Sequence, residues 1–147
     1  MDASEAKSPI NYKMIINGDL VEASSGQYLE VESPGTKTIF ARVPRAAKID
    51  VDMAVSAAST ALPHWSKVSP RDRGRILLKI ADDLEAKIEP LANIIAKETG
   101  NAIRTQARPE ATQVSDIFRY FGGLASELKG ETIPISDNVL SYTRREP

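Results

Sequence analysis

The sequence contains no cysteine, a single histidine and few aromatic residues, which make up 5% of its 147 positions. Without cysteine, this chain can form no disulfide, no thiolate metal site and no thiol nucleophile. Its 19 basic and 20 acidic residues are mixed along the chain, which indicates neither a nucleic-acid surface nor a membrane as a partner. No apolar run approaches the roughly 18 residues that a membrane-spanning helix needs.

The residues that are present have the composition of one folded domain. Hydrophobic residues account for 41% of the chain and charged residues for 27%, and 147 residues suffice to bury a core. The acidic start has the layout of neither a signal peptide nor a transit peptide, so a cytoplasmic location is expected. Residues 1–12 are polar and are expected to form a flexible N-terminal arm.

The longest helical signal runs from Ser69 to Gly100. Ser69 is a suitable N-cap, Gly100 is a natural stop, and Pro90 predicts a break near residues 88–90 because proline removes a helical hydrogen bond. Two helices are therefore expected. Apolar residues at steps of three and four form their common stripe: Leu77, Ile80, Ala81, Leu84, Ile88, Leu91 and Ile95.

An earlier helix is predicted over residues 49–61. Pro63 is expected to end it, with His64 beginning a loop. The small side chains on this helix favour close approach to a neighbouring element. The apolar positions at helical spacing are Val51, Ala54, Val55, Ala58 and Leu62.

A later helix is predicted from Arg108 or Pro109 to Leu128. Within it, Gly122 and Gly123 cost helical stability and indicate close contact with another element. The apolar residues expected to face the core are Val114, Ile117, Phe118, Phe121, Leu124, Ala125 and Leu128.

Short strands are expected before and after the helices. Asn-Gly at positions 17–18 lies between apolar runs and predicts a tight β-hairpin, because its turn needs positive φ at both central residues. Residues 27–32 and 38–43 predict a second antiparallel pair, joined by a turn at residues 33–36. After a turn at Pro134, residues 139–143 read as one extended strand. The segment is therefore α+β.

The sequence shows no catalytic constellation. His64 lies beside Trp65 without an acid or nucleophile at a recognisable spacing, which favours a surface or packing role over catalysis. No glycine-rich phosphate loop appears, and the spread of acidic residues over helix surfaces favours ion pairs over a metal site. Arg71, Arg73 and Arg75 are candidates for anion binding, but pairing with acidic neighbours is the favoured interpretation.

Nine short phrases span nearly the whole chain from Met14. They are Ile16-Asn17-Gly18, Ser33-Pro34-Gly35-Thr36, Asp50-Val51-Asp52-Met53-Ala54-Val55, Trp65, Arg73-Gly74-Arg75-Ile76-Leu77-Leu78-Lys79-Ile80-Ala81-Asp82, Glu98-Thr99-Gly100, Arg119-Tyr120-Phe121-Gly122-Gly123, Gly130-Glu131-Thr132-Ile133-Pro134 and Ser141-Tyr142-Thr143-Arg144-Arg145-Glu146-Pro147. In this order they resemble the N-terminal portion of the aldehyde dehydrogenase superfamily. The resemblance implies an α/β protein in which residues 13–135 belong to a Rossmann-like cofactor domain and residues 136–147 begin an oligomerisation strand.

The same resemblance implies an oxidoreductase that converts an aldehyde into a carboxylic acid with NAD or NADP. In the family, a cysteine thiolate attacks the aldehyde, a hydride leaves for the nicotinamide, and a glutamate-activated water hydrolyses the thioester. Those residues and the dinucleotide-binding strands lie C-terminal to the matching stretch. No catalytic or cofactor-binding residue therefore carries over, and these 147 residues alone are expected to be inactive.

Three further roles carry over by position. Pro109 and Gln113 match residues that line the aldehyde entrance tunnel, with plain helix packing as the alternative. The backbone carbonyls of Val31 and Glu32, together with Glu98, match a structural monovalent-cation site, with an ordinary helix-end carboxylate at Glu98 as the alternative. The residues that resemble the family's first oligomerisation strand are Tyr142, Thr143, Arg144, Arg145 and Glu146.

The implied partners are the remainder of a longer chain, a small aldehyde and further copies of the protein in a dimer or tetramer. A second hypothesis, from another class, is a non-catalytic α+β interaction module that associates through its C-terminal strand. Under the first hypothesis, the helical stripe from Leu77 to Ile95 belongs against a sheet outside these residues. The isolated chain is then expected to be aggregation-prone or partly unfolded, because the uncovered apolar area is not stabilised by burial.

Overall fold

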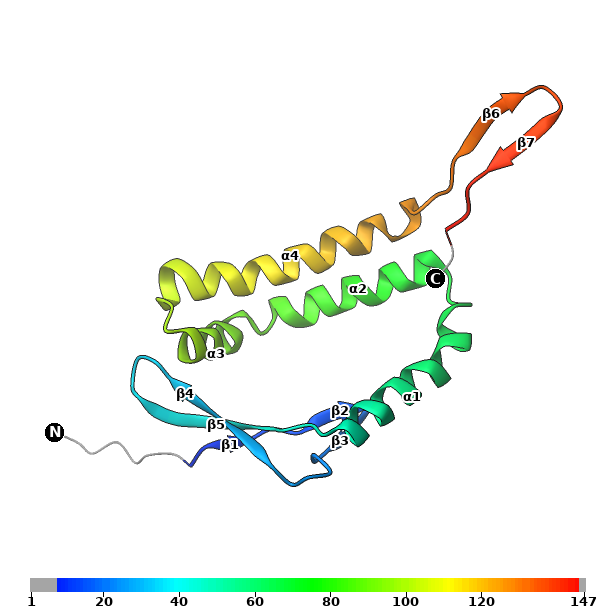
Figure 1. The fold of residues 1–147 in the computed structure, drawn as a ribbon. Coiled ribbons are helices and arrows are strands. Elements are labelled where there is room, and N and C mark those ends of the chain that lie inside the picture. Colours follow the sequence, from blue (N-terminus) through cyan, green and yellow to red (C-terminus); the bar gives the residue numbers. More distant parts are fainter. Residues whose placement is uncertain (1–7, 146–147) are drawn as a thin grey trace.

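The computed structural model describes residues 8–145, which form small sheets, packed helices and a projecting strand pair (Figure 1). The first hairpin pairs β2 (Met14–Ile16) with β3 (Asp19–Val21). Its two turn residues have positive φ, 55° at Asn17 and 88° at Gly18, so the predicted hairpin is confirmed.

A second sheet has the strand order β1-β5-β4. Antiparallel β4 (Tyr28–Ser33) and β5 (Thr38–Pro44) form the pair that the sequence predicts. The two-residue strand β1 (Ile10–Asn11) pairs with β5 in parallel. The expectation of a loose arm was therefore wrong at residues 10–11, where backbone pairing orders a stretch too short to show a period. Residues 1–7 lie outside the described part.

Helix α1 (Lys48–Trp65) is longer than predicted, because Pro63 does not end it. The proline falls in the last turn, and the Ser66 amide closes that turn by donating to the Leu62 carbonyl at 2.8 Å. Pro63 still lacks the N–H that would donate to the Ser59 carbonyl, so the last turns of α1 lose one helical hydrogen bond while the chain keeps its helical course to Trp65.

Asp50 joins the start of α1 to the preceding loop. Its buried carboxylate accepts hydrogen bonds from the Ala47 amide at 2.7 Å and from the amide and hydroxyl of Ser24, each at 3.0 Å. The Ala47 amide is the main reason why the pKa of Asp50 lies below its ordinary value; burial acts in the opposite direction. The large apolar side chains of α1 are mostly exposed to solvent, and Val55, for example, is 60% exposed.

The long helical signal divides into α2 (Pro70–Glu85) and α3 (Ile88–Thr99). Ser69 caps α2 by accepting from the Asp72 amide at 3.1 Å, and Gly100 ends α3 with a φ of 79°. The break falls just ahead of the predicted position, so that Pro90 lies in the first turn of α3, where no helical N–H is missed.

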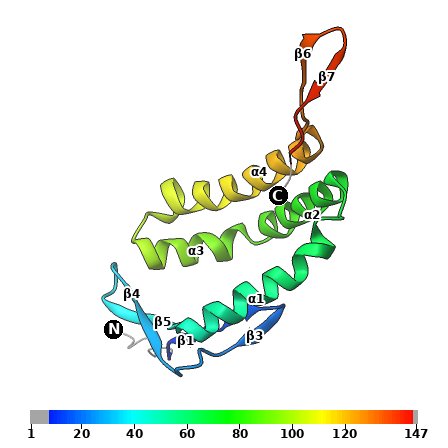
Figure 2. The ribbon, with the colours of Figure 1, turned by 45° about the vertical axis from the view of Figure 1, so that its right-hand side comes forward.

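A π-helical turn, Ile103–Ala107, leads from α3 into α4 (Arg108–Leu124), and a 3₁₀ turn, Ala125–Glu127, follows. Helix α4 lies beside α2 and α3 in both views (Figures 1 and 2). Arg108 forms a two-pronged ion pair with Glu89 of α3, which lowers the pKa of that carboxyl. Arg119 binds Asp82 and Glu85 of α2, each at 2.8 Å.

The interface between α2 and α4 is built from small residues. Gly74 and Gly122 face each other so closely that a Cβ built on Gly74 would lie 2.6 Å from the Gly122 carbonyl oxygen. The contact expected of the glycine pair is thus confirmed for Gly122, whereas Gly123 faces open space. The fully buried apolar residues of the helices are alanines: Ala81, Ala92, Ala107 and Ala111.

The larger apolar residues are covered less than the sequence suggests. Leu77, Leu91 and Ile95 are half-buried. The core face predicted for α4 was wrong in most positions: Phe121 is 56% exposed, and the fully buried positions are Ala111, Ser115 and Gly122. Of the predicted residues, Phe118 and Ala125 are half-buried. Because the glycine contact brings the backbones of α2 and α4 together, only small side chains fit between them.

The chain ends in a third strand pair, β6 (Thr132–Ser136) with β7 (Val139–Tyr142), which projects from the helices (Figures 1 and 2). The predicted turn at Pro134 was wrong, because this residue lies inside β6 opposite Leu140. Both strands of a two-stranded sheet are edge strands, where proline is tolerated. Strand β6 also extends across residue 135, where the sequence analysis placed the boundary between the cofactor domain and the oligomerisation strand.

Candidate functional site

The predicted tunnel residues lie on the uncovered side of α4. Pro109 and Gln113 are both exposed and one turn apart. Ile117 and Phe121 continue the same row at intervals of four residues, and both are exposed. The row has one amide and otherwise apolar side chains. It is chemically suited to contact an apolar molecule or another apolar surface.

The predicted cation-site residues come from two elements in contact, because α3 packs against β4. Val31 and Glu32 lie where the β4–β5 ladder is irregular: Val31 pairs with Ala41, and Glu32 pairs with Ile39. The Glu32 carboxylate lies 3.7 Å from the ammonium of Lys37. Glu98 lies near the end of α3. Within residues 8–145, no three His, Asp or Glu side chains gather as potential metal ligands. The cation site stays a prediction.

The predicted oligomerisation residues lie at the end of β7. Only Tyr142 belongs to the strand; Thr143, Arg144 and Arg145 follow it, and Glu146 lies outside the described residues. Sequence reasoning missed β6 and therefore the exposed apolar side chains of the pair, among which Leu140 is 79% exposed. This projecting pair has the open edges and apolar faces that favour association with another chain.

Two hydrogen bonds between Glu131 and Thr143 join the ends of the β6–β7 pair that lie nearest the helices. The Thr143 amide donates to the Glu131 carbonyl at 2.8 Å, and the Glu131 amide donates to the Thr143 hydroxyl at 2.8 Å. A Cβ on Gly130 would overlap the Thr143 carbonyl oxygen. Only glycine fits there without moving the strands.

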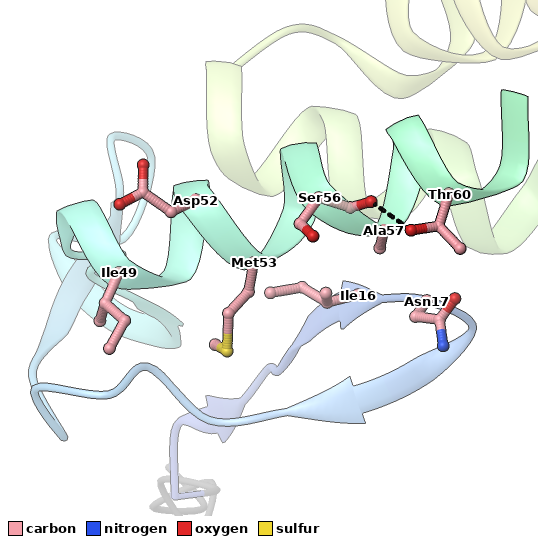
Figure 3. Close-up of a pocket in the computed structure, with 8 residues that line it drawn as sticks. All are labelled: Ile16, Asn17, Ile49, Asp52, Met53, Ser56, Ala57 and Thr60. Atoms are coloured by element: carbon pink, nitrogen blue, oxygen red, sulfur yellow. Dashed lines mark hydrogen bonds between the residues drawn. The ribbon is translucent and has the colours of Figure 1, made fainter.

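Two hollows lie elsewhere on the surface. The first, of about 500 Å³, separates α1 from the β2–β3 hairpin, where Met53 and Ile16 occupy the space between helix and strand (Figure 3). Thr60 and Ser56 contribute hydroxyls, and the Thr60 hydroxyl donates to the Ser56 carbonyl at 2.9 Å. The carboxylate in this lining, that of Asp52, is paired with Lys48 at 2.5 Å.

The second hollow, of about 530 Å³, lies where the end of α1 meets the start of α2 and the end of α4. Sequence reasoning assigned Arg73 to pairing with an acidic neighbour, which was wrong. Asp72 pairs with Arg75 at 3.0 Å instead. The Arg73 guanidinium donates to the Trp65 and Ser66 carbonyls.

The sequence matches the family model described as "Aldehyde dehydrogenase family" over residues 20–147. The chain belongs to the aldehyde dehydrogenase family. Its resemblance to the N-terminal portion, drawn above from nine phrases, is confirmed at the level of the family. None of the helices in the described range has the length and hydrophobicity needed to cross a membrane.

Curated relatives support this membership. Aldehyde dehydrogenase 1 of Tanacetum cinerariifolium is 36% identical over 137 residues, which are 92% of this chain and 28% of that protein. Cytosolic 10-formyltetrahydrofolate dehydrogenase of Xenopus tropicalis is 35% identical over 144 residues, covering 94% of this chain and 16% of that protein. The chain therefore spans little more than a quarter of the first relative, and less of the second.

Solved structures share the fold. The NAD⁺ complex of aldehyde dehydrogenase from Bacillus cereus has a TM-score of 0.88 at 34% identity, covering 93% of this chain and 28% of that one. PnpE from Pseudomonas sp. WBC-3 has a TM-score of 0.86 at 37% identity, covering 94% of this chain and 28% of that one. The arrangement of strands and helices described above is thus that of a segment of an aldehyde dehydrogenase.

Proposed function

We propose that these residues form the N-terminal segment of an NAD- or NADP-dependent enzyme that oxidises a small aldehyde to a carboxylic acid. The observation that carries this proposal is the family match over residues 20–147. Neighbours of the same fold include an aldehyde dehydrogenase solved with NAD⁺. The cofactor would be held by residues outside this chain.

Uncovered apolar surface supports the proposal physically. Val55 on α1, Phe121 on α4 and Leu140 on β7 are each more than half exposed, although each lies in a regular helix or strand. Large apolar side chains that stay exposed side by side on a helix face or strand pair favour an interaction surface. We infer that the remainder of a longer chain covers α1 and α4.

The individual site assignments follow from this reading. Pro109 and Gln113 are proposed to line the aldehyde entrance, and the apolar row to which they belong supports this role. Val31, Glu32 and Glu98 are proposed to hold a monovalent cation, supported by the packing of α3 against β4. The projecting β6–β7 pair is proposed to join subunits of a dimer or tetramer. A relative named cytosolic supports a cytoplasmic location.

The purified 147-residue chain is expected to reduce no NAD with acetaldehyde or a longer aliphatic aldehyde. It contains no cysteine to form the thiohemiacetal from which a hydride would leave. The polypeptide translated from the complete reading frame is the matched comparison and is expected to produce NADH, followed by absorbance. Turnover by the 147 residues, or its absence in the complete product with every aldehyde and both cofactors, would contradict the proposal.

The projecting strand pair favours a second candidate function. In this alternative, the chain is a non-catalytic α+β module that binds other chains through β6 and β7. A reading frame that ends at Pro147 would favour the module. Continuation into a segment with a glycine-flanked cysteine would favour the enzyme.

A further inference from the structure

The start of α4 is fastened to α3 by a two-pronged ion pair. Arg108, the first residue of α4, donates from Nε to one oxygen of the Glu89 carboxylate and from Nη2 to the other, the latter at 3.0 Å. Glu89 lies in the first turn of α3. Paired donors restrict the orientation of both groups as well as their separation. This ion pair therefore fixes how the start of α4 is placed against α3.

The apolar contacts at this end of α4 are less specific. Ala92 of α3 packs with Ala107 and Ala111 between the two helices. Burial of apolar groups is non-directional, so these methyl groups hold the helices together without fixing the position of one along the other. At the far end of α4, by contrast, the backbone of Gly122 meets that of Gly74 directly. The start of α4 thus depends on the ion pair more than its end does.

The segment between α3 and α4 is ordered by hydrogen bonds of its own. The Ala107 amide donates to the Ala102 carbonyl at 3.1 Å in the π-helical turn, and the Asn101 side-chain amide donates to the Glu110 carboxylate at 3.2 Å. Such turns beside α-helices are frequent at functional sites. Together with the ion pair, these hydrogen bonds hold the first turn of α4 in one place.

The proposed aldehyde entrance adjoins these contacts. Pro109 follows Arg108 directly, and Gln113 lies one helical turn, about 5.4 Å, further along α4. Proline has no amide hydrogen to donate, so the position of Pro109 depends on its neighbours. Arg108 and Glu89 lie at the junction of α3 and α4, and Arg108 does not belong to the exposed row that continues through Ile117.

From these contacts we propose that Arg108 and Glu89 are positioning residues for the aldehyde entrance and act on long aldehydes. This proposal rests on the enzymatic function proposed above. In an entrance tunnel the reacting carbonyl lies at the inner end, so only an aldehyde with a long chain reaches Pro109 and Gln113. Displacement of the first turn of α4 therefore weakens the binding of octanal and leaves that of acetaldehyde unchanged.

Steady-state kinetics of the polypeptide translated from the complete reading frame test the proposal. Unbranched aldehydes from acetaldehyde to octanal are compared, with NAD and with NADP. Arg108→Gln and Glu89→Gln are each expected to raise KM increasingly with chain length, by roughly fivefold for octanal, which is the upper end of the range for exposed ion pairs. The kcat values are expected to stay unchanged, because the binding that is lost is shared by the ground state and the transition state.

Two further variants separate the ion pair from other effects. The double variant, which combines Glu89→Gln with Arg108→Gln, is expected to match either single variant, because the second substitution has no contact left to remove. Arg104→Gln is the matched control, since Arg104 is an exposed arginine of the neighbouring π-helical turn. Its KM values are expected to equal those of the unmodified protein.

An unmodified protein that oxidises no aldehyde would contradict the proposed function and the positioning role together. An active protein whose KM for octanal is the same in Arg108→Gln and Glu89→Gln would overturn the positioning role alone. So would an equal fall of kcat for every aldehyde at unchanged KM, which indicates a lower folded fraction. Additive effects in the double variant would also overturn it, because they indicate two independent residues.

Discussion

Replacing Gly74 with alanine is expected to destabilise the pairing of α2 and α4 by about 2 kcal/mol. The new Cβ would lie 2.6 Å from the Gly122 carbonyl oxygen and 3.1 Å from the Ala125 Cβ. The first of these neighbours is backbone and cannot rotate away, so the helices must separate. Amide hydrogen exchange in α2 and α4, read peptide by peptide, is expected to accelerate roughly 30-fold, because 1.4 kcal/mol corresponds to a factor of ten.

Gly123→Ala is the matched control for this substitution. Gly123 also lies in α4, but a Cβ there meets no atom within 4 Å. Alanine is the better helix former by about 1 kcal/mol, so exchange in α4 is expected to slow or stay unchanged. Equal effects of the two substitutions would show that helix propensity, rather than the contact at Gly74, determines the result.

Leu140→Glu is expected to dissociate the assembled protein. Leu140 is 79% exposed on the projecting β6–β7 pair, and it contacts a partner if that pair joins subunits. Loss of its burial costs about 2 kcal/mol for each copy of the leucine, and an uncompensated carboxylate in an interface adds to this cost. Light scattering coupled to size exclusion is expected to show a lower molar mass, with the helical circular dichroism unchanged.

Asn138→Glu supplies the control for the added charge. Asn138 lies between β6 and β7, so the substitution adds the same charge to the turn of the same strand pair. Its molar mass is expected to equal that of the unmodified protein. If Leu140→Glu also leaves the molar mass unchanged, the β6–β7 pair does not hold the assembly together.

Local sequence signals predicted most elements well because their causes are local. The Asn17-Gly18 turn, the Ser69 cap and the Gly100 stop each depend on the conformational preference of one or two residues. The same logic placed a break between α2 and α3. Pro63 and Pro134 were misjudged for a common reason. The cost of a proline depends on its position: Pro134 lies in an edge strand, which tolerates it, and Pro63 removes only one hydrogen bond near the end of the 18-residue α1.

The core face of α4 was not predictable from periodicity. The spacing of Ile117, Phe121 and Leu124 identifies an apolar face, but it cannot tell whether the covering element lies within these residues. The inward positions are taken by Ala111, Ser115 and Gly122, because α2 approaches closely at Gly74. Such an approach is a property of two distant segments together, and neither segment shows it alone.

The positions of the candidate site residues were predicted in part. The family resemblance predicted oligomerisation residues at the end of β7. The structure adds strand β6, which the sequence did not predict, and its exposed side chains. The family resemblance also singled out Pro109 and Gln113. Nothing in the amino-acid composition indicated that both would be exposed in one row along α4. Arg73 was noticed among the arginines near Ser69, but its stacking on Trp65 requires the meeting of α1 with α2, which only the fold supplies.

The most direct test is to measure the sedimentation and thermal unfolding of the unmodified 147-residue chain. If α1, α4 and the β6–β7 pair are surfaces for the rest of an aldehyde dehydrogenase, their exposed apolar side chains have no partner in this chain. We expect heterogeneous association and a broad loss of circular dichroism without a single cooperative transition. A monomeric species with one sharp, reversible transition would contradict the conclusion that these residues are part of a larger folded unit.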